Sequence, residues 1–154
     1  MCSSGKGIMK KVEIVILDTE REYRDLYRDA FLSGSLHFAG IPVSFHESDF
    51  DHIFFEPSAG GGYVFSDRRA KRMLFIVEIL AGNVIVELGY QEDRATFALF
   101  SRELECVVYL RRRSGSGALQ VGTFFDFGKD HEKMYRKQKK KCVDVTLQEM
   151  RDML

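Results

Sequence analysis

The sequence carries no excess of charge of either sign, because its 23 lysines and arginines equal its 23 aspartates and glutamates. A protein that attracts nucleic acid through a general positive field usually has a basic excess over the whole domain. That class of binder is excluded, so any nucleic-acid partner must be held by local clusters of cations.

Cysteine is scarce and poorly spaced for structural chemistry. Cys2, Cys106 and Cys142 are odd in number, lie far apart and form no CxxC pair. This spacing argues against a disulfide scaffold and against a zinc ribbon. It indicates a reducing, cytoplasmic setting. Cys106 lies inside a β-type run, and we expect it in the core rather than as a nucleophile.

Long apolar runs are also missing, since the longest stretches are short and interrupted by charge. The opening MCSSGKG has no signal-peptide hydrophobic region, and we expect no membrane partner. No internal repeat, linker or low-complexity segment divides the chain. A length of 154 residues with 45% apolar content suits one compact domain. We expect a disordered tail over residues 1–10 and a single domain over residues 11–154.

Hydrophobic periodicity predicts an α+β domain, with an N-terminal strand and helices packed on a small antiparallel β-sheet. The predicted ranges are a strand at 12–18, a helix at 20–32, two extended pieces within 34–45, helices at 46–56 and 65–80, strands at 95–100, 105–112 and 118–127, and helices at 130–141 and 146–154. Residues 57–63 should form a flexible loop. Pro42 should keep its extended piece at a sheet edge, after a turn at Ala39 and Gly40. A cleft should separate the helical part from the three-stranded meander.

The helix predicted at 65–80 places cations where a helix least favours them. Ser66 is a good N-cap and Asp67 suits the first turn. The first two turns, however, are crowded with the cations Arg68, Arg69, Lys71 and Arg72. The free N–H groups there already carry about half a positive charge. A bound phosphate would make this arrangement favourable. The alternative is that these side chains snorkel or pair with carboxylates elsewhere in the chain.

Three short motifs occur in the order that is typical of one nuclease family. They are Asp51-His52-Ile53-Phe54 in the short helix, Arg69-Ala70-Lys71-Arg72 in the basic helix and Thr123-Phe124-Phe125 in the last strand. Over roughly residues 38–127 the sequence therefore resembles the phage-associated branch of the barnase, EndoU, colicin and RelE-like (BECR) nucleases. Two positions depart from the family pattern. The usual aromatic after the second motif is Phe75, and the last strand has phenylalanine where tyrosine is common.

The resemblance implies a metal-independent endoribonuclease that cleaves RNA, such as tRNA, as a toxin or mobile-element effector. His52 would act as acid or base, since the ordinary pKa of histidine is about 6.5. Arg69 and Arg72 would stabilise the phosphate through forked donors, and Thr123 would bind the phosphate or position the histidine. An inhibitor or antitoxin protein would be a further partner. Neither a cofactor nor a metal ion is expected.

Further RNA contacts are expected from neighbouring cations. These are Arg68, Lys71, Arg111 and Arg112. Side chains alternate along a strand, so Arg111 and Arg112 should lie on opposite faces, and only one of them should contact RNA. The run RKQKKK at 136–141 is most often a solvated helix face, although it could extend the RNA-binding surface through counterion release.

Two alternatives stay open. The segment HESDFDH offers metal-binding side chains, but His46 and His52 would lie roughly 120° apart on a helix, unlike the i, i+4 pair of a zinc helix. The second alternative concerns function: a nuclease-like domain that binds RNA or a protein partner without cutting would share the same phosphate-binding residues.

Overall fold

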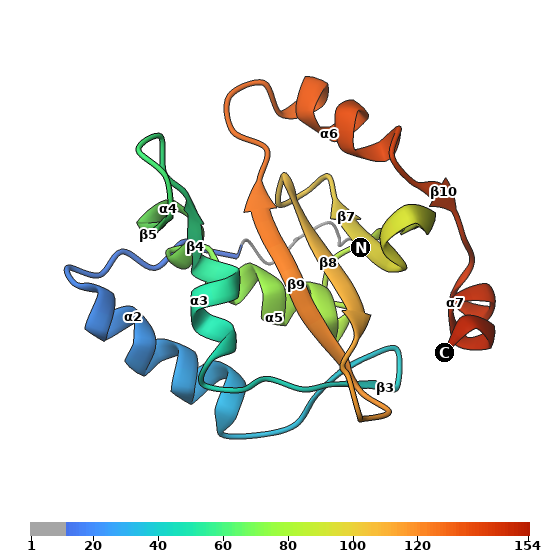
Figure 1. Cartoon of the computed structure of the whole chain (residues 1–154), viewed down its shortest axis with the longest axis horizontal. Coiled ribbons are helices and arrows are strands. Elements are labelled where there is room, and N and C mark those ends of the chain that lie inside the picture. The colour runs from blue at the N-terminus through green and yellow to red at the C-terminus, as the bar shows by residue number, and fades with distance from the viewer. Residues whose placement is uncertain (1–11) are drawn as a thin grey trace, which may run out of the picture.

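The computed structural model describes residues 12–154, so the predicted tail at 1–10 lies outside the described residues. The fold is mixed α+β, with one large sheet and several helices (Figure 1). The helices are α2 (Glu20–Tyr27) continued by the π-helical turn η1 (Arg28–Leu32), α3 (Asp49–Phe54), α4 (Asp67–Ala70), α5 (Met73–Ala81), the 3₁₀ turn η2 (Glu92–Arg94), α6 (His131–Lys139) and α7 (Leu147–Met153). The strands are β2 (Leu36–Phe38), β3 (Ile41–Val43), β4 (Phe55–Pro57), β5 (Tyr63–Phe65), β6 (Glu87–Gln91), β7 (Thr96–Ser101), β8 (Cys106–Arg112), β9 (Leu119–Asp126) and β10 (Val143–Asp144).

The large sheet has seven strands in the order β10-β6-β7-β8-β9-β3-β2. β6 to β9 form an antiparallel meander, which confirms the three strands predicted at 95–100, 105–112 and 118–127. The expectation of a small, purely antiparallel sheet is wrong, because β3 joins β9 in parallel through Val43 and Leu119. β3 is therefore an inner strand, and the edge predicted from Pro42 is wrong. Pro42 has no N–H to donate, which limits the parallel pairing to this one residue pair.

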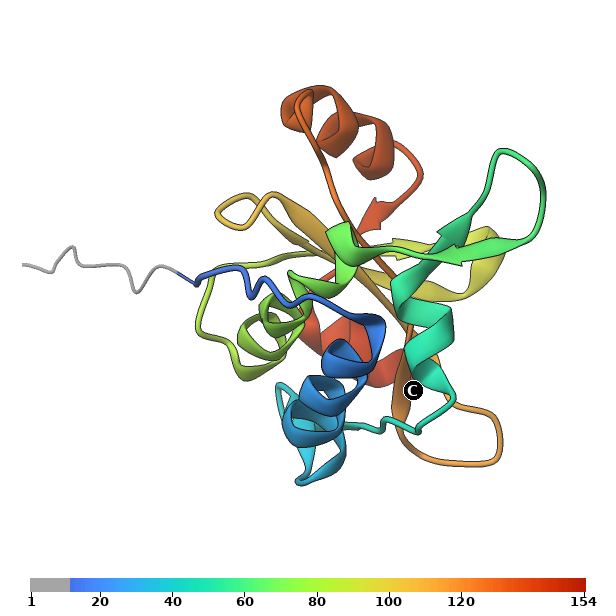
Figure 2. The same cartoon turned by 90° about the vertical axis from the view of Figure 1, so that its left-hand side faces the viewer.

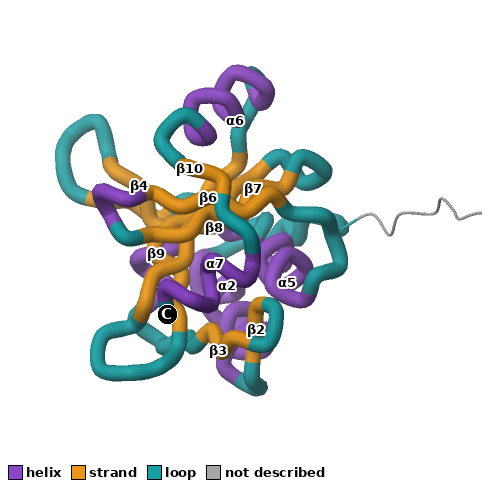
Figure 3. Tube along the Cα trace, turned by 90° about the vertical axis from the view of Figure 1, so that its right-hand side faces the viewer, coloured by secondary structure: helices purple, strands orange, loops and turns teal. Residues whose placement is uncertain are grey.

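The two faces of the sheet bury separate hydrophobic clusters. Helices α2, α3, α5 and α7 pack on one face, where side chains such as Ile76 and Leu99 are fully buried. Helix α6 covers part of the other face, where Phe100 and Tyr135 are buried. Figure 2 shows α6 and α2 on opposite sides of the sheet, and Figure 3 shows α6 and α5 in the same relation. The sheet therefore presents one covered face and one partly open face.

The predicted strand at 12–18 is wrong, because this segment forms no strand. The N–H of Val15 donates to the carbonyl oxygen of Lys71 at 2.8 Å. The hydroxyl of Tyr23 donates to the carbonyl oxygen of Val15 and accepts from the N–H of Leu17. The β-branched composition of the segment favours extended backbone, but a strand also needs a partner strand to pair with. Here isolated hydrogen bonds to helical residues take the place of a ladder.

The predicted helix at 65–80 is interrupted between α4 and α5. In a continuous α-helix the N–H of Phe75 would donate to the carbonyl oxygen of Lys71, four residues earlier. It donates instead to Arg72, at 2.9 Å, and Lys71 accepts from Val15. The predicted N-cap Ser66 is confirmed, since its hydroxyl accepts from the N–H of Arg69 at 3.2 Å.

The interruption changes where the cations lie. Arg68 and Arg69 belong to the single turn of α4, and Arg72 occupies the N-cap position of α5. The expected crowding of four cations into the first two turns of one long helix is therefore wrong. The four side chains are instead spread around a bend between two helices.

Four strands have no counterpart in the predicted elements. β4 and β5 form a hairpin whose connecting residues 58–62 make up most of the loop predicted at 57–63, and β6 and β10 extend the sheet at the other end. The sequence of β6, ELGYQ, has little of the β-branched content that indicates a strand. Gly89 packs closely against β10's neighbour Cys142, because a Cβ at position 89 would lie 3.0 Å from the Cβ of Cys142.

The remaining predicted elements are confirmed. A hairpin turns at Ala39 and Gly40, which both have positive φ, as a type I′ turn requires. Helices form within the ranges predicted at 20–32, 46–56, 130–141 and 146–154. None of the helices formed by residues 12–154 combines the length and the apolar composition that crossing a bilayer would require.

Candidate nucleic-acid interface

Three adjoining pockets lie along β9 and α6. The sheet pocket, of about 560 Å³, is lined by Gln91, Arg94, Thr96, Tyr109, Arg111, Gly122, Thr123, Phe125, Gln138 and Lys141. The α6 pocket, of about 640 Å³, is lined by Glu56, Arg68, Arg69, Phe125, Asp126, Phe127, Gly128, Lys129, Asp130, Lys133, Met134 and Lys137. The α4 pocket, of about 570 Å³, is lined by Arg68, Lys71, Arg72, Leu104, Glu105, Asp126, Gly128 and Lys129.

The pockets share residues and so form one surface, which we call the basic strip. Phe125 lines both the sheet pocket and the α6 pocket. Arg68 and Lys129 line both the α6 pocket and the α4 pocket. The strip begins on the partly open face of the sheet rather than between the sheet and the main helical layer. The cleft predicted between the helical part and the meander is present only where α4 faces β9, in the α6 and α4 pockets, because the larger hydrophobic core fills the rest of that space.

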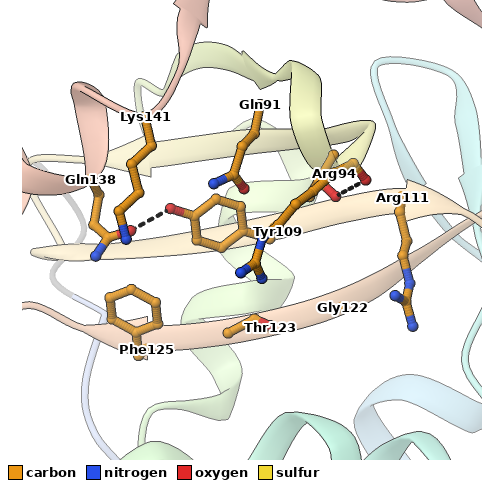
Figure 4. Close-up of a pocket in the computed structure, with 10 residues that line it drawn as sticks. Gln91, Arg94, Tyr109, Arg111, Gly122, Thr123, Phe125, Gln138 and Lys141 are labelled. Carbon is orange, nitrogen blue, oxygen red and sulfur yellow. Dashed lines mark hydrogen bonds between the residues drawn. The ribbon is translucent and has the colours of Figure 1, made fainter.

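In the sheet pocket, Tyr109 and Thr123 face each other from β8 and β9. Figure 4 shows the side chains of Gln91, Arg94 and Lys141 directed towards Tyr109. The hydroxyl of Tyr109 donates to Oε1 of Gln138 at 2.8 Å. Burial raises the pKa of Tyr109, so this phenol stays protonated and acts as a hydrogen-bond donor.

The charge of the sheet pocket is entirely positive. Its charged residues are Arg94, Arg111 and Lys141, and no carboxylate lines it. Within residues 12–154 none of these three cations forms an ion pair. Arg111 lies against Gly122, where a Cβ would be in ordinary van der Waals contact with its Nε, at 3.7 Å. All three cations are exposed, so their charge is available to an anionic ligand.

Carboxylates do reach the α6 pocket, and they neutralise only part of its charge. Arg68 pairs with Asp126 at 2.9 Å. Gly128, at φ +70°, permits this approach, because a Cβ there would lie 2.7 Å from Nη2 of Arg68. Lys133 and Lys137 on α6 form no ion pair with any described residue. Lys133 and Lys137 thus keep their charge available to a ligand.

Arg69 is held in a half-buried position at the start of the hairpin. Its Nη1 donates to the carbonyl oxygen of Phe55 at 3.0 Å, and its Nε lies 3.8 Å from Glu56. Burial lowers the pKa of Arg69 and outweighs the opposing effect of the carboxylates of Glu56 and Asp126. The guanidinium remains protonated, since arginine does not lose its proton in proteins. Its charge is nevertheless poorly compensated, and a bound phosphate would stabilise it.

Arg72 and Lys71 supply the cations of the α4 pocket. Nη1 of Arg72 donates to the carbonyl oxygen of Arg68 at 2.8 Å, which spans the bend between α4 and α5. The other N–H groups of Arg72 keep no ion-pair partner among the described residues. The bend therefore points a second guanidinium towards the same surface as Arg69.

His52 lies at the margin of the basic strip and does not line any of its three pockets. Its side chain is exposed on α3, a helix that packs against β9. On one flank of α3, Asp51 pairs with Arg24 of α2 at 2.6 Å. On another flank Asp49 pairs with Arg113, next to the end of β8. His52 is rotated about 60° from Asp49 and about 100° from Asp51, so it lies between them on the exposed face of α3.

His52 and Arg69 also lie near the same end of α3. Arg69 donates to Phe55, which follows α3 directly. Phe55 is three residues beyond His52, which corresponds to ~4.5 Å of helix rise. The structure thus places Arg69, Arg72 and Thr123 in adjoining pockets and His52 on the neighbouring helix. It does not bring the histidine into contact with the other predicted catalytic side chains.

The predicted RNA-binding residues divide in the same way. Arg68, Lys71 and Arg111 line the basic strip. Arg112 lies elsewhere, and its Nη2 donates to the carbonyl oxygen of Met153 on α7 at 3.2 Å. The alternation of side chains along β8 thus separates the two arginines as predicted.

Sequence analysis did not single out several residues of the strip. They are Gln91, Arg94, Tyr109, Lys129 and Lys133. Gln138 lies within the RKQKKK run. Lys137 and Lys141 belong to the RKQKKK run, whose composition was a usable signal. Gln91 and Arg94 carried no signal, because they reach the pocket from a strand and turn that the composition did not indicate.

Comparison with protein-family models, with curated proteins and with solved structures found no match to this chain. The BECR-like identity and its nuclease activity therefore stay predictions. Among residues 12–154, no three His, Cys, Asp or Glu side chains are grouped so that they could hold a metal ion.

Proposed function

We propose that the protein binds RNA along the basic strip and cleaves it without a metal ion. The observation that carries this proposal is the continuity of the strip. Unpaired cations follow one another through three adjoining pockets in a chain whose total charge is zero. Phosphates spaced along a nucleic-acid strand are the ligand that such a row of cations matches. Phe125, at the junction of two pockets, adds an aromatic ring on which a base can stack.

The proposed reaction is attack by a ribose 2′-oxygen on the adjacent phosphorus. The bond from phosphorus to the 5′-oxygen breaks, which leaves a 2′,3′-cyclic phosphate and a free 5′-hydroxyl. One group must accept the proton of the 2′-hydroxyl and another must supply a proton to the leaving oxygen. His52 is the proposed acid or base. Arg69 and Arg72 would stabilise the charge of the phosphorane, with Thr123 as a hydrogen-bond donor to the phosphate.

The proposal extends to the biological setting implied by the family resemblance. It is a BECR-like ribonuclease that acts in the cytoplasm on tRNA or another structured RNA, as a toxin or mobile-element effector. An inhibitor or antitoxin protein would then be needed to cover the basic strip. The order of the three sequence motifs supports this part of the proposal, together with the α+β fold and its antiparallel meander.

The experiment that tests the function is incubation of the purified protein with total RNA in the presence of EDTA. We expect RNA fragments that end in a 2′,3′-cyclic phosphate, and we expect DNA of matched sequence to stay intact, because it has no 2′-hydroxyl. Cleavage that EDTA abolishes would contradict the mechanism. Fragments with ordinary 3′-hydroxyl ends would contradict it as well.

A second candidate function is binding of RNA without cleavage. The observation that favours it is the position of His52, whose side chain is exposed and makes no hydrogen bond with any described residue. A catalytic histidine is usually oriented by a partner. Under this alternative the same RNA would be retained in a salt-dependent manner and recovered uncut.

A further inference from the structure

The sheet pocket contains chemistry that phosphate binding alone does not use. Gln91 and Gln138 both line it, and their side chains are buried, with 9% and 8% exposure. No described residue forms a hydrogen bond with the side-chain amide of Gln91. Its polar atoms are nevertheless open to the pocket rather than sealed in the core. A buried amide without a protein partner costs free energy unless a ligand or solvent pairs with it.

The two amides offer different hydrogen-bonding groups. Oε1 of Gln138 accepts from the hydroxyl of Tyr109, which leaves the NH₂ group of Gln138 as a donor. Gln91 keeps both its carbonyl oxygen and its NH₂ group. The pocket therefore presents an acceptor as well as donors. A phosphate has no use for the acceptor, whereas the edge of a nucleobase has donors and acceptors side by side.

Aromatic rings bound the same space. The rings of Tyr109 and Phe125 have centroids 6.2 Å apart and are tilted by 32°, and Phe125 is half-buried, so part of its ring is open. Figure 4 shows Gln91, Gln138 and Phe125 around Tyr109, with Arg94 and Lys141 beside them. The sheet pocket has a volume of about 560 Å³, which falls within the range of small-molecule pockets, ~300–1,000 Å³.

We propose that the sheet pocket is a nucleobase subsite, which takes one unstacked base of a single-stranded RNA. Gln91 and Gln138 bond the edge of the base, Phe125 stacks on its face, and Arg94 and Lys141 hold the flanking phosphate. The inference rests on the proposed function in taking RNA as the ligand, and it adds that the target must be unpaired at this position. Recognition of splayed bases by amides and aromatic rings is a general means of reading single-stranded RNA.

The test is a titration of the isotope-labelled protein with each of the four nucleoside 5′-monophosphates, followed by NMR. Ribose 5-phosphate and inorganic phosphate are the probes that lack a base. We expect at least one nucleotide to bind about fivefold or more tightly than ribose 5-phosphate, since stacking and edge contacts add to phosphate binding. The side-chain amide signals of Gln91 and Gln138 should shift with that nucleotide and not with ribose 5-phosphate.

Single substitutions should distinguish the contribution of the base to the affinity from that of the phosphate. Gln91→Ala and Phe125→Leu should bind the nucleotide no more tightly than ribose 5-phosphate. Their affinity for ribose 5-phosphate should equal that of the unmodified protein. Lys141→Ala should weaken both ligands. Gln148→Ala is the matched control, because Gln148 lies on α7 and bonds only Asp152 on the same helix. Equal affinity for all nucleotides and ribose 5-phosphate would overturn the inference, as would unmoved amide signals in the unmodified protein.

The outcome is independent of the cleavage test. Base-dependent binding by a protein that leaves RNA uncut would support the subsite and reject the nuclease. Cleavage of RNA without any base-dependent binding would reject the subsite alone.

Discussion

The N–H of Val15 donates to the carbonyl oxygen of Lys71 at 2.8 Å and so joins the start of the described chain to the bend between α4 and α5. This bond occupies the carbonyl that a continuous helix would have paired with Phe75. The bond thus lies where both the predicted N-terminal strand and the predicted continuous basic helix are absent. At this bend Arg72 stands at the N-cap position of α5 and bonds back to Arg68.

Amide hydrogen exchange should report this bond directly. We expect the amide of Val15 to exchange much more slowly than those of Ile14 and Ile16, whose N–H groups make no backbone hydrogen bond within the described residues. The neighbouring amides serve as matched controls, because they share the same solvent and the same segment. Exchange at Val15 as fast as at Ile14 and Ile16 would contradict the contact.

The wrong predictions of a strand at 12–18 and of one continuous helix at 65–80 show what sequence periodicity can and cannot predict. Periodicity located the meander and most helices, because each of those elements buries a regular pattern of its own side chains. It could not locate the bend at Lys71 and Arg72, where Lys71 bonds Val15, a residue far away in the sequence. It also missed β6, whose composition is unsuited to a strand and whose Gly89 packs closely against Cys142.

The site was predictable to a similar extent. Arg69, Arg72 and Thr123 were singled out from local motifs, and the fold places them in adjoining pockets. Gln91 and Arg94 were not predictable, since a pocket residue without a motif becomes visible only when tertiary structure brings it to the others.

A buried ion pair should be the main polar support of the helix that carries His52. Nη2 of Arg113 lies 2.5 Å from Oδ2 of Asp49, and these side chains are only 13% and 8% exposed. Arg113→Ala leaves the carboxylate of Asp49 buried without its partner, which typically costs about 3–5 kcal/mol in the free energy of unfolding. Urea denaturation should measure this loss.

The neighbouring Arg112→Ala is the matched control for that measurement. Arg112 is exposed, and its removal should change the free energy of unfolding by no more than about 0.5 kcal/mol. If both variants unfold at the same urea concentration as the parent, Arg113 does not support α3 in the way proposed.

Low pH should weaken the attachment of α6 to the sheet, because Tyr135 on α6 bonds the carboxylate of Glu87 on β6. The hydroxyl of Tyr135 lowers the pKa of Glu87, aided by Arg102 and Lys139 and opposed by burial. Since the native pKa is below the unfolded value of 4.5, this contribution is complete above that pH and is lost as the pH falls through the native pKa. The carboxylate is 39% exposed, so the effect should be about 0–1 kcal/mol.

The measurement for Glu87 is the free energy of unfolding as a function of pH. Glu87→Gln should lose most stability near neutral pH and converge with the parent protein in acid. Glu103→Gln is the control, because Glu103 is exposed and forms no ion pair among the described residues. A constant difference between Glu87→Gln and the parent at every pH would rule out the linkage.

Arg111 and Arg112 provide a matched pair for the RNA-binding surface. Arg111 lines the sheet pocket, whereas Arg112 bonds Met153 on α7. Arg111→Ala should weaken the binding of single-stranded RNA and reduce the slope of log K against log salt by about 0.7, the value of one released counterion. Arg112→Ala should leave both quantities unchanged. Equal slopes for the two variants would place the RNA on another surface.

His52 should separate cutting from binding. It lies on the exposed face of α3, near the end at which Arg69 bonds Phe55, but outside the three pockets that hold the cations. A general acid or base typically contributes about 10²- to 10⁴-fold to a rate. His52→Ala should therefore lower the cleavage rate by that factor in EDTA and leave RNA affinity unchanged, since the cations stay in place.

His37→Ala is the matched control for His52, because His37 is also exposed but lies on the outer strand β2, away from the strip. Rates from single-turnover cleavage and affinities from uncut RNA should be compared for both variants, with circular dichroism to verify folding. A His52→Ala variant that is folded and cuts as fast as His37→Ala would remove this histidine from the mechanism. The acid and base would then have to come from the basic strip itself, while RNA binding by that strip would stand unaffected.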